Sequence, residues 1–200
     1  MTTRKLAVLL STAVLIGGCG GGSSQDGNQA EGGGAESRLF PDSFKGVCSG
    51  AGVAEATAFE ESAKTHKALL FQTYKDDLQD QSHRLPPAWT VKFSPTADAL
   101  AAIDVVICAK RTDAKLVKTC DGYKSDGKPT DNKVRWHTAT YEVSAHEAKT
   151  GEKLESKTLA ATDETCPMFA SFDGSSETID NYATLSDEAL TEFAKPFVQP

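Results

Sequence analysis

The second half of the chain shows the clearest alternation of apolar and polar residues. Residues 134–147 alternate over most of their length, and residues 154–161 roughly alternate again after a Lys-Thr-Gly-Glu turn. A period of two residues is typical of a strand with one buried face. We therefore predict a β-hairpin from these two segments. On its first strand, the expected core face carries His137, Ala139, Tyr141, Val143 and Ala145.

Two nearly continuous apolar runs predict strands that are covered on both faces. Residues 69–71 are Leu-Leu-Phe, and residues 103–109 are apolar except for Asp104. The longer run is what a central strand of a sheet requires. We expect a polar turn at residues 112–114 to end this run and a returning strand over residues 116–123 to pair with it.

Helical spacing is found near both ends of this region. Residues 53–67 place small and apolar side chains three and four positions apart, which predicts a helix. Near the C-terminus, Ser186 is a favourable N-cap, and the acidic residues after it suit the positive end of a helix dipole. Residues 89–93 suggest a strand and residues 94–102 a short helix. The expected buried stripe of the last helix is Leu190, Phe193, Ala194 and Phe197.

These elements together predict an α+β fold. We expect an antiparallel or mixed β-sheet of about four or five strands with helices packed on it, including a C-terminal helix. Residues 39–200 contain no low-complexity break and no internal repeat, so we expect them to form a single domain.

The N-terminus predicts export and lipidation. Two basic residues precede the uncharged run 6–16, which is too short to span a bilayer as a permanent helix. The sequence Ile16-Gly17-Gly18-Cys19 then resembles the lipobox of bacterial lipoproteins. The resemblance implies that residues 1–18 are a signal peptide and that Cys19 becomes lipidated. The alternative is ordinary secretory cleavage, with Cys19 as an incidental thiol.

The segment after Cys19 predicts a tether. Residues 19–38 are rich in Gly, Ser, Gln and Glu and lack apolar periodicity, so they cannot bury enough surface to fold. We therefore expect a lipid-anchored chain on the extracytoplasmic face of the cell membrane, with the membrane as its first partner.

The remaining cysteines predict two disulfides. Cys48, Cys108, Cys120 and Cys166 form an even set in an exported chain. Three pairings are possible, and we favour Cys108 with Cys120, since both lie on the arms of the expected hairpin, which leaves Cys48 with Cys166. A four-cysteine zinc site is the alternative, although the sequence has no C-x-x-C pair.

Charge and motifs exclude several classes of function. Without Arg4 and Lys5 the mature chain has 19 basic residues against 28 acidic ones, a net charge of −9. This acidity makes nucleic acid an unsuitable partner. The chain has no GxSxG, P-loop, GxGxxG or HExxH motif, so we assign no catalytic residue, no metal ligand and no cofactor.

The candidate chemistry is therefore sparse. Trp136 beside Arg135 is our candidate binding face, because an exposed Trp suits a glycan or a protein surface. His137 and His146 lie nine residues apart on one strand, which directs them to opposite faces and away from joint metal binding. The acidic loop residues Asp121, Asp126 and Asp131 could hold calcium, but their spacing is not that of an EF-hand. A second acidic stretch comprises Asp163, Glu164, Asp173, Glu177 and Asp180.

Part of the chain resembles a group of known proteins. The runs VVICAKR, KTCDGYKSDGKPTDNKVRWHTATYEVSAHEAKTGEKL and DETCPMF resemble lipoproteins and surface domains of actinobacteria such as Streptomyces. That resemblance covers about half the chain and implies an envelope location without an activity. The hairpin at residues 145–159 is also similar to envelope domains related to the curli-secretion lipoprotein or to the amino-terminal domain of TolB.

Two functions remain open at this point. We expect a non-enzymatic binding or structural module of the cell envelope that meets a protein, a glycan or a small ligand. The alternative is an envelope hydrolase that uses carboxylates of the two acidic stretches. A deep cleft with convergent carboxylates would favour the enzyme, and a flat aromatic patch would favour binding.

Overall fold

The computed structural model describes residues 38–92, 94 and 98–199. The predicted signal peptide, residues 1–18, and the predicted lipidation site Cys19 lie outside these residues. The predicted tether also lies outside them, except for Arg38. The described residues belong to a compact unit that spans Ser37–Pro200.

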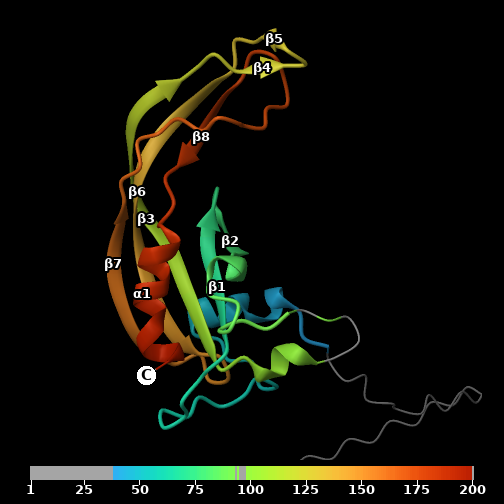
Figure 1. The fold of residues 1–200 in the computed structure, drawn as a ribbon, viewed down its shortest axis with the longest axis vertical. Helices are drawn as coiled ribbons and strands as arrows, with labels where there is room; N and C mark the ends of the chain where they lie inside the picture. The colour runs from blue at the N-terminus through green and yellow to red at the C-terminus, as the bar shows by residue number, and fades with distance from the viewer. Residues whose placement is uncertain (1–37, 93, 95–97, 200) are drawn as a thin grey trace, which may run out of the picture. The chain divides into compact units, whose positions relative to one another are not determined.

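A six-stranded mixed sheet organises the described residues (Figure 1). Its strand order is β2-β1-β3-β6-β7, and β8 pairs with β6 beside the end of β7. The pairs β1–β3 and β6–β8 are parallel, and the other pairs are antiparallel. The strands are β1 Ala68–Tyr74, β2 Asp77–Asp80, β3 Val105–Cys120, β6 Lys133–Glu147, β7 Lys153–Ala161 and β8 Thr178–Tyr182. The expected mixed sheet is confirmed, with more strands than predicted.

The predicted hairpin is formed by β6 and β7. Their register pairs Tyr141 with Leu159 and Val143 with Lys157, and it shifts between Ala145 and His146. Four of the five residues expected on the core face are buried, as the alternation required; His137 is partly exposed. Figure 1 shows that β3 and β6 bend strongly, with β8 and the β1–β2 turn on the inner side of the bend.

The predicted turn at residues 112–114 is wrong. The strand β3 continues through it, and Asp113 and Ala114 pair with Thr140 and Ala139 of β6. The polar residues are there because the second half of β3 is mostly exposed. The segment also lacks Gly, Pro and Asn, the residues that most strongly end a strand in a tight turn. Irregularities near residues 112 and 117 bend the strand instead of ending it.

The C-terminal helix is confirmed as α1, Asp187–Val198. The Ser186 side chain accepts a 3.1 Å hydrogen bond from the amide of Ala189, which satisfies one of the free donors of the first turn. Val198 is fully buried, whereas the predicted Phe197 is only partly buried. The remaining helical elements are the short 3₁₀ helices η1 Pro41–Ser49, η2 Ser82–Arg84 and η3 Ala99–Ala102.

The predicted helix over residues 53–67 is wrong. This segment is irregular and is held by contacts with other segments: the amide of Val53 donates to Ala148, and that of Thr57 donates to Ala101. The Phe59 ring stacks on His66 at 4.6 Å. The predicted helical stripe, Ala56, Phe59, Ala63 and His66, has only one large apolar side chain to bury, so local propensity is outweighed by these contacts.

The predicted strand over residues 89–93 is also wrong in its described part. Pro86 and Pro87 initiate a turn, and the amide of Trp89 closes it on the carbonyl of Pro86 at 2.9 Å. Trp89 is buried at the end of that turn. Of the helix predicted over residues 94–102, the structure describes η3, which begins at Ala99, whereas residues 95–97 lie outside the described part.

Each face of the sheet packs on a separate apolar cluster. On one face, Tyr141 and Val143 pack with Leu190 and Ala194 of α1, and we call this group the α1-side cluster. On the opposite face, Val106 and Leu69 pack with residues of η1 and of the irregular segment. The first half of β3 is therefore covered on both sides, which explains its continuous apolar run.

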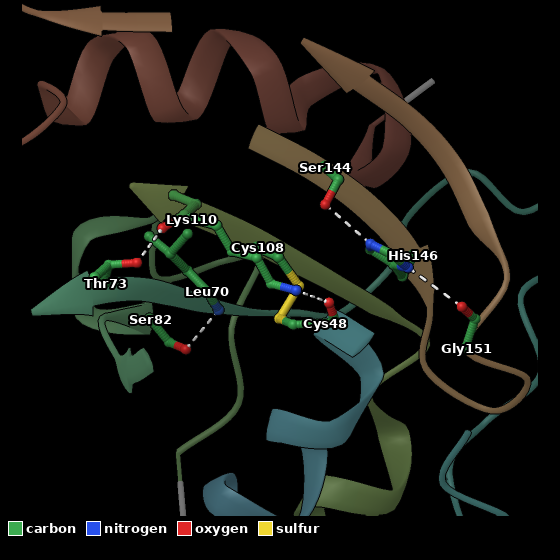
Figure 2. The surroundings of a disulfide bond; sticks show 10 residues. Cys48, Leu70, Thr73, Ser82, Cys108, Lys110, Ser144, His146 and Gly151 are labelled. Carbon is green, nitrogen blue, oxygen red and sulfur yellow. Dashed lines mark hydrogen bonds between the residues drawn. A yellow bond between two sulfur atoms is a disulfide. The ribbon is translucent and has the colours of Figure 1, made fainter. Parts of the chain in front are cut away.

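The predicted cysteine pairing is wrong, although both disulfides exist. Cys48 bonds to Cys108, and Cys120 bonds to Cys166, with Cα separations of 5.6 and 5.9 Å. Cys108 and Cys120 lie on the same continuous strand, roughly 40 Å apart by the rise of a strand, so they cannot bond. The first disulfide fastens η1 to the sheet (Figure 2), and the second fastens the segment after β7 to the end of β3.

Candidate functional site

Three adjoining pockets lie along the inner side of the bend, and we call them together the trough. Their volumes are about 490, 200 and 360 Å³. Pro167 is shared by the first two pockets, Phe169 by the first and third, and Tyr74 by the last two. The aromatic residues that line the trough are Tyr74, Tyr123, Trp136, Tyr141, Phe169, Phe172 and Tyr182.

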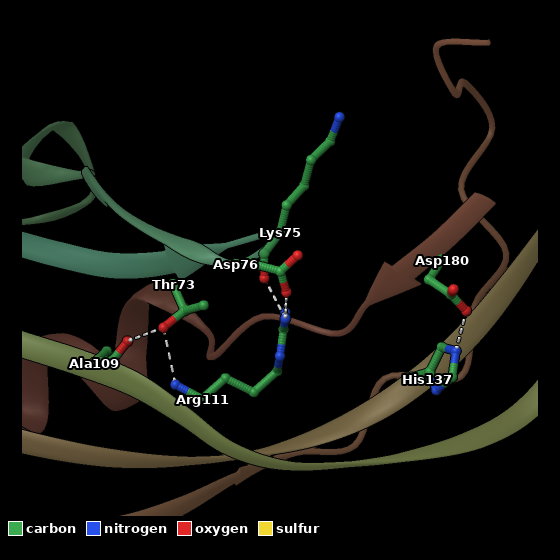
Figure 3. A network of polar contacts seen from close by, with 7 residues as sticks. All are labelled: Thr73, Lys75, Asp76, Ala109, Arg111, His137 and Asp180. Carbon is green, nitrogen blue, oxygen red and sulfur yellow. Dashed lines mark hydrogen bonds and ion pairs between the residues drawn. The ribbon is translucent and has the colours of Figure 1, made fainter.

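Arg111 of β3 is one of the cations that line the trough, and Figure 3 shows its polar contacts. Its guanidinium donates to the carbonyl of Lys75 in the β1–β2 turn and lies 3.5 Å from a carboxylate oxygen of Asp76. Lys75 has a φ of 52°, a left-handed conformation that costs a non-glycine residue about 1 kcal/mol. The Arg111 contact therefore fixes a strained turn at the rim of the trough.

Asp180 of β8 carries the opposite charge. Its carboxylate accepts from the guanidinium of Arg135 and lies 2.7 Å from Nε2 of His137. The hydrogen bond from Arg135 lowers the pKa of Asp180, and the contact with His137 lowers it further. Asp180 is thus held as an anion. Two residues further along β8, the Tyr182 ring stacks on His137 with 4.9 Å between the ring centroids.

Trp136 fixes the wall of the trough opposite the β1–β2 turn. Its indole N–H donates a 2.8 Å hydrogen bond to the carbonyl of Asp163, which follows β7. The ring is partly buried against the α1-side cluster and also lines the pocket of about 200 Å³. The predicted binding pair Trp136 and Arg135 thus comes from adjacent positions of β6: Trp136 lines the trough directly, and Arg135 reaches it through Asp180.

An exposed apolar pair, Met168 and Phe169, lies at the first pocket of the trough. Met168 and Phe169 are 85% and 87% exposed, more than any other large apolar residue described. They follow Cys166, whose disulfide to Cys120 attaches this segment to the sheet. The hydroxyl of Tyr123 donates to the carbonyl of Pro167 at 3.0 Å, which supports the same segment. Two apolar side chains are therefore presented to solvent from an anchored backbone.

Two other polar pairs are buried and lie apart from the trough. Ser144 and His146 share a 2.9 Å hydrogen bond, and the other ring nitrogen of His146 lies 3.2 Å from the carbonyl of Gly151 (Figure 2). Burial lowers the pKa of His146. His66 and Asp104 form a 2.6 Å contact beneath the irregular segment. All four side chains are buried, so neither pair meets solvent as the structure stands.

The predicted acidic stretches contribute to the trough without forming a metal site: Asp173, Glu177 and Asp180 line its third pocket, and Asp121 lines its first. Within the described part of the chain, no group of three or more His, Cys, Asp or Glu side chains is arranged to hold a metal ion, and this includes Asp121, Asp126 and Asp131. Asp163 accepts hydrogen bonds from Thr165, which lowers its pKa. His137 and His146 contact different groups, as their odd separation indicated.

Several trough residues carry no signal that the sequence pattern could isolate. Arg111 stands in a polar run that suggested a turn, and Tyr182 precedes the C-terminal helix without any motif. The contact between Arg111 and Tyr182 depends on the parallel pairing of β8 with β6, which a pattern of alternation does not specify. Met168 and Phe169 do carry a signal: two large apolar residues directly after Cys166-Pro167 in a polar stretch.

Comparison of the chain with protein families, with curated proteins and with solved structures finds no match. Among the described helices, none combines the length and apolar character that a membrane span requires.

Proposed function

We propose that this protein is a lipid-anchored binding module of the cell envelope and that its trough binds a glycan. The observation that carries the proposal is the lining of the trough. Aromatic side chains lie there beside charged groups that other residues already hold in place: Arg111 stacks on Tyr182, and Arg135 and His137 hold Asp180. Sugar rings have apolar C–H faces and hydroxyl rims, so they suit such a mixture of ring faces and fixed polar groups.

The arrangement of the three pockets supports a glycan chain of several sugar units as the ligand. The three pockets adjoin one another through shared residues instead of forming one deep cavity. Exposed Tyr74 and Phe169 stand at their junctions and offer ring faces beside the open surface. A group of adjoining open pockets offers several places for sugar units, which suits a glycan of more than one unit better than a compact metabolite.

The anchor in this proposal rests on the N-terminal motif. The run Ile16-Gly17-Gly18-Cys19 motivates lipidation, and the two disulfides suit an oxidising, extracytoplasmic compartment. Cys19→Ser tests it: the wild-type chain should partition into the detergent phase and carry an acyl mass at Cys19, and the variant should not. Equal partitioning of the two chains would contradict the anchor.

A hydrolase remains the competing proposal. Glycoside hydrolysis requires a carboxylic acid that keeps its proton near neutral pH beside a second, ionised carboxylate. In the trough, the hydrogen bond with Arg135 lowers the pKa of Asp180. This carboxylate is therefore held in its ionised form and does not suit the role of proton donor. Released sugar fragments after prolonged incubation with a bound glycan would favour the hydrolase.

The ligand is tested by titration with fragments of bacterial cell-wall polysaccharide. The chain has two tryptophans, and Trp89 is buried in the core, so Trp89→Phe leaves Trp136 as the reporter in the trough. We expect saturable changes in Trp136 fluorescence that are lost in Tyr74→Ala. Exposed Leu116, which lies outside the trough residues named above, supplies the matched control Leu116→Ala. Equal responses from the two variants, or none from the parent, would contradict binding in the trough.

A further inference from the structure

The outer edge of β7 is open. β7, Lys153–Ala161, pairs with β6 on one side, and no described strand pairs with its other side. Figure 1 shows β7 at the outer edge of the sheet, beside α1. An open strand edge presents backbone N–H and C=O groups that can pair with another chain.

A shallow groove with both apolar and charged side chains in its lining runs beside this edge. Its volume is about 180 Å³, and it lies between β7 and α1. Leu159 is the apolar residue of the β7 wall, and Phe193, Pro196 and Phe197 of α1, with Glu192 beside them, form the other wall. The Phe193 and Phe197 rings contact each other at 5.7 Å between centroids. A strand added to β7 would therefore direct alternate side chains toward this groove.

The side chains of β7 on the groove side form a row of distinct chemistry. Glu155, Lys157 and Leu159 pair with Ala145, Val143 and Tyr141 of β6, whose side chains lie in the α1-side cluster. All three β7 residues also line the groove. The row thus reads acidic, basic, apolar at a spacing of two residues, which is the spacing at which an added strand meets its neighbours.

The same row disfavours a second copy of this chain as the occupant. Antiparallel pairing of β7 with β7 over its full length would place Lys157 directly opposite the Lys157 of the other copy. Like charges in directly opposed positions destabilise a strand pair. Lysines on an open strand are a common means of preventing such self-association.

We propose that the edge of β7 and the adjoining groove bind an extended peptide segment of a partner protein. The peptide adds antiparallel to β7, since antiparallel ladders are slightly more stable per residue than parallel ones. In the order of its own sequence it carries an apolar residue opposite Leu159, an acidic residue opposite Lys157 and a basic residue opposite Glu155, each separated by one residue. The backbone ladder provides affinity, and the three alternate side chains provide specificity.

A fluorescent peptide, Thr-Leu-Thr-Asp-Thr-Lys-Thr, tests this proposal by anisotropy with the full chain. A matched peptide exchanges its Asp and Lys. The first peptide binds roughly tenfold more tightly than the second, because the exchange replaces two opposite-charge pairs with two like-charge pairs. The double variant Glu155→Lys with Lys157→Glu inverts this preference. Both residues are exposed and the net charge is unchanged, so the variant keeps the fold.

Two further measurements separate strand addition at β7 from charge attraction elsewhere on the surface. The exposed double swap Asp113→Lys with Lys115→Glu on β3 is the matched control and leaves the preference unchanged. Two further peptides are N-methylated at alternate backbone nitrogens, one at the odd-numbered residues and the other at the even-numbered residues. Only the peptide whose methylated nitrogens face β7 loses binding. Equal affinity for both peptides, undiminished binding of both methylated peptides, or a wild-type dimer that the peptide displaces would overturn the proposal.

Discussion

The guanidinium carbon of Arg111 lies 3.5 Å from the centre of the Tyr182 ring. This stack joins β3 to β8, two strands that lie on opposite sides of β6 in the sheet. It also places a cation over an aromatic face in the pocket of about 200 Å³. An Arg guanidinium in this position is worth about 1–2 kcal/mol when partly desolvated.

The first prediction concerns this stack. Arg111→Lys keeps the charge but loses the planar stacking and the bond to the Lys75 carbonyl, so the free energy of unfolding should fall by about 1–2 kcal/mol. Urea denaturation measures the loss. The double variant with Tyr182→Leu should lose less than the sum of the two single variants, because both disrupt the same contact. Strict additivity would show that the stack contributes nothing.

A second prediction concerns the disulfide between Cys48 and Cys108. The bonded residues are 60 positions apart, and the chain-entropy estimate for a loop of this length is about 4 kcal/mol. The variant Cys48→Ala with Cys108→Ala should therefore lose about that much stability in urea. Non-reducing peptide mapping should join Cys48 to Cys108. A peptide joining Cys108 to Cys120 would contradict the continuous strand β3.

The sequence predicts the hairpin of β6 and β7 and the capped helix α1 because each follows from local rules. Alternation sets the buried face of β6, and Ser186 with its acidic neighbours sets the start of α1. The β6–β7 pair needs only a short turn to fix which strand meets which. No distant contact is required for either element.

The wrong predictions concern features that local sequence rules do not determine. The run Thr112-Asp113-Ala114 is polar because β3 leaves the core there, and sequence polarity does not separate an exposed strand from a turn. The wrong cysteine pairing follows from this one error. Likewise, the trough depends on β8 lying parallel to β6, a long-range pairing between Asp180 and Arg135 that local patterns do not encode.

A third prediction concerns pH and His146. Its ordinary pKa is 6.5, and burial lowers it in the folded state, a change that the nearby charges of Lys153 and Lys110 reinforce. As the pH falls below about 6.5, the unfolded chain binds a proton at His146 that the folded chain does not. The stability associated with this group is therefore complete above pH 6.5 and decreases as the pH falls below it.

Chemical denaturation at several pH values between 5 and 7.5 measures this slope. His146→Gln should reduce the slope because it removes the titrating ring. The exposed His83→Gln is the matched control and should leave the slope unchanged. A His146→Gln variant with the wild-type slope would show that other groups control the pH dependence.

The last prediction separates the two disulfides by what each one holds. Cys48–Cys108 fastens elements of the core, whereas Cys120–Cys166 fastens the segment that carries Met168 and Phe169. In Cys120→Ser with Cys166→Ser, this segment keeps few apolar contacts, because both of its large side chains face solvent. We therefore expect glycan affinity to fall at least about tenfold, since the ordering of the segment must then be supplied by binding.

Phe169→Ser in the chain with both disulfides intact distinguishes the ring from its support. This substitution removes an exposed side chain and should change stability by less than about 0.5 kcal/mol. If the disulfide acts by holding Phe169 against the ligand, the combined variant, with both cysteines and Phe169 replaced, should bind little more weakly than the cysteine variant alone, because the two changes remove one interaction. Isothermal titration with the same cell-wall fragments measures all three variants. Full additivity would mean that the disulfide supports a part of the trough other than Phe169, such as the Tyr123 and Phe172 rings beside it.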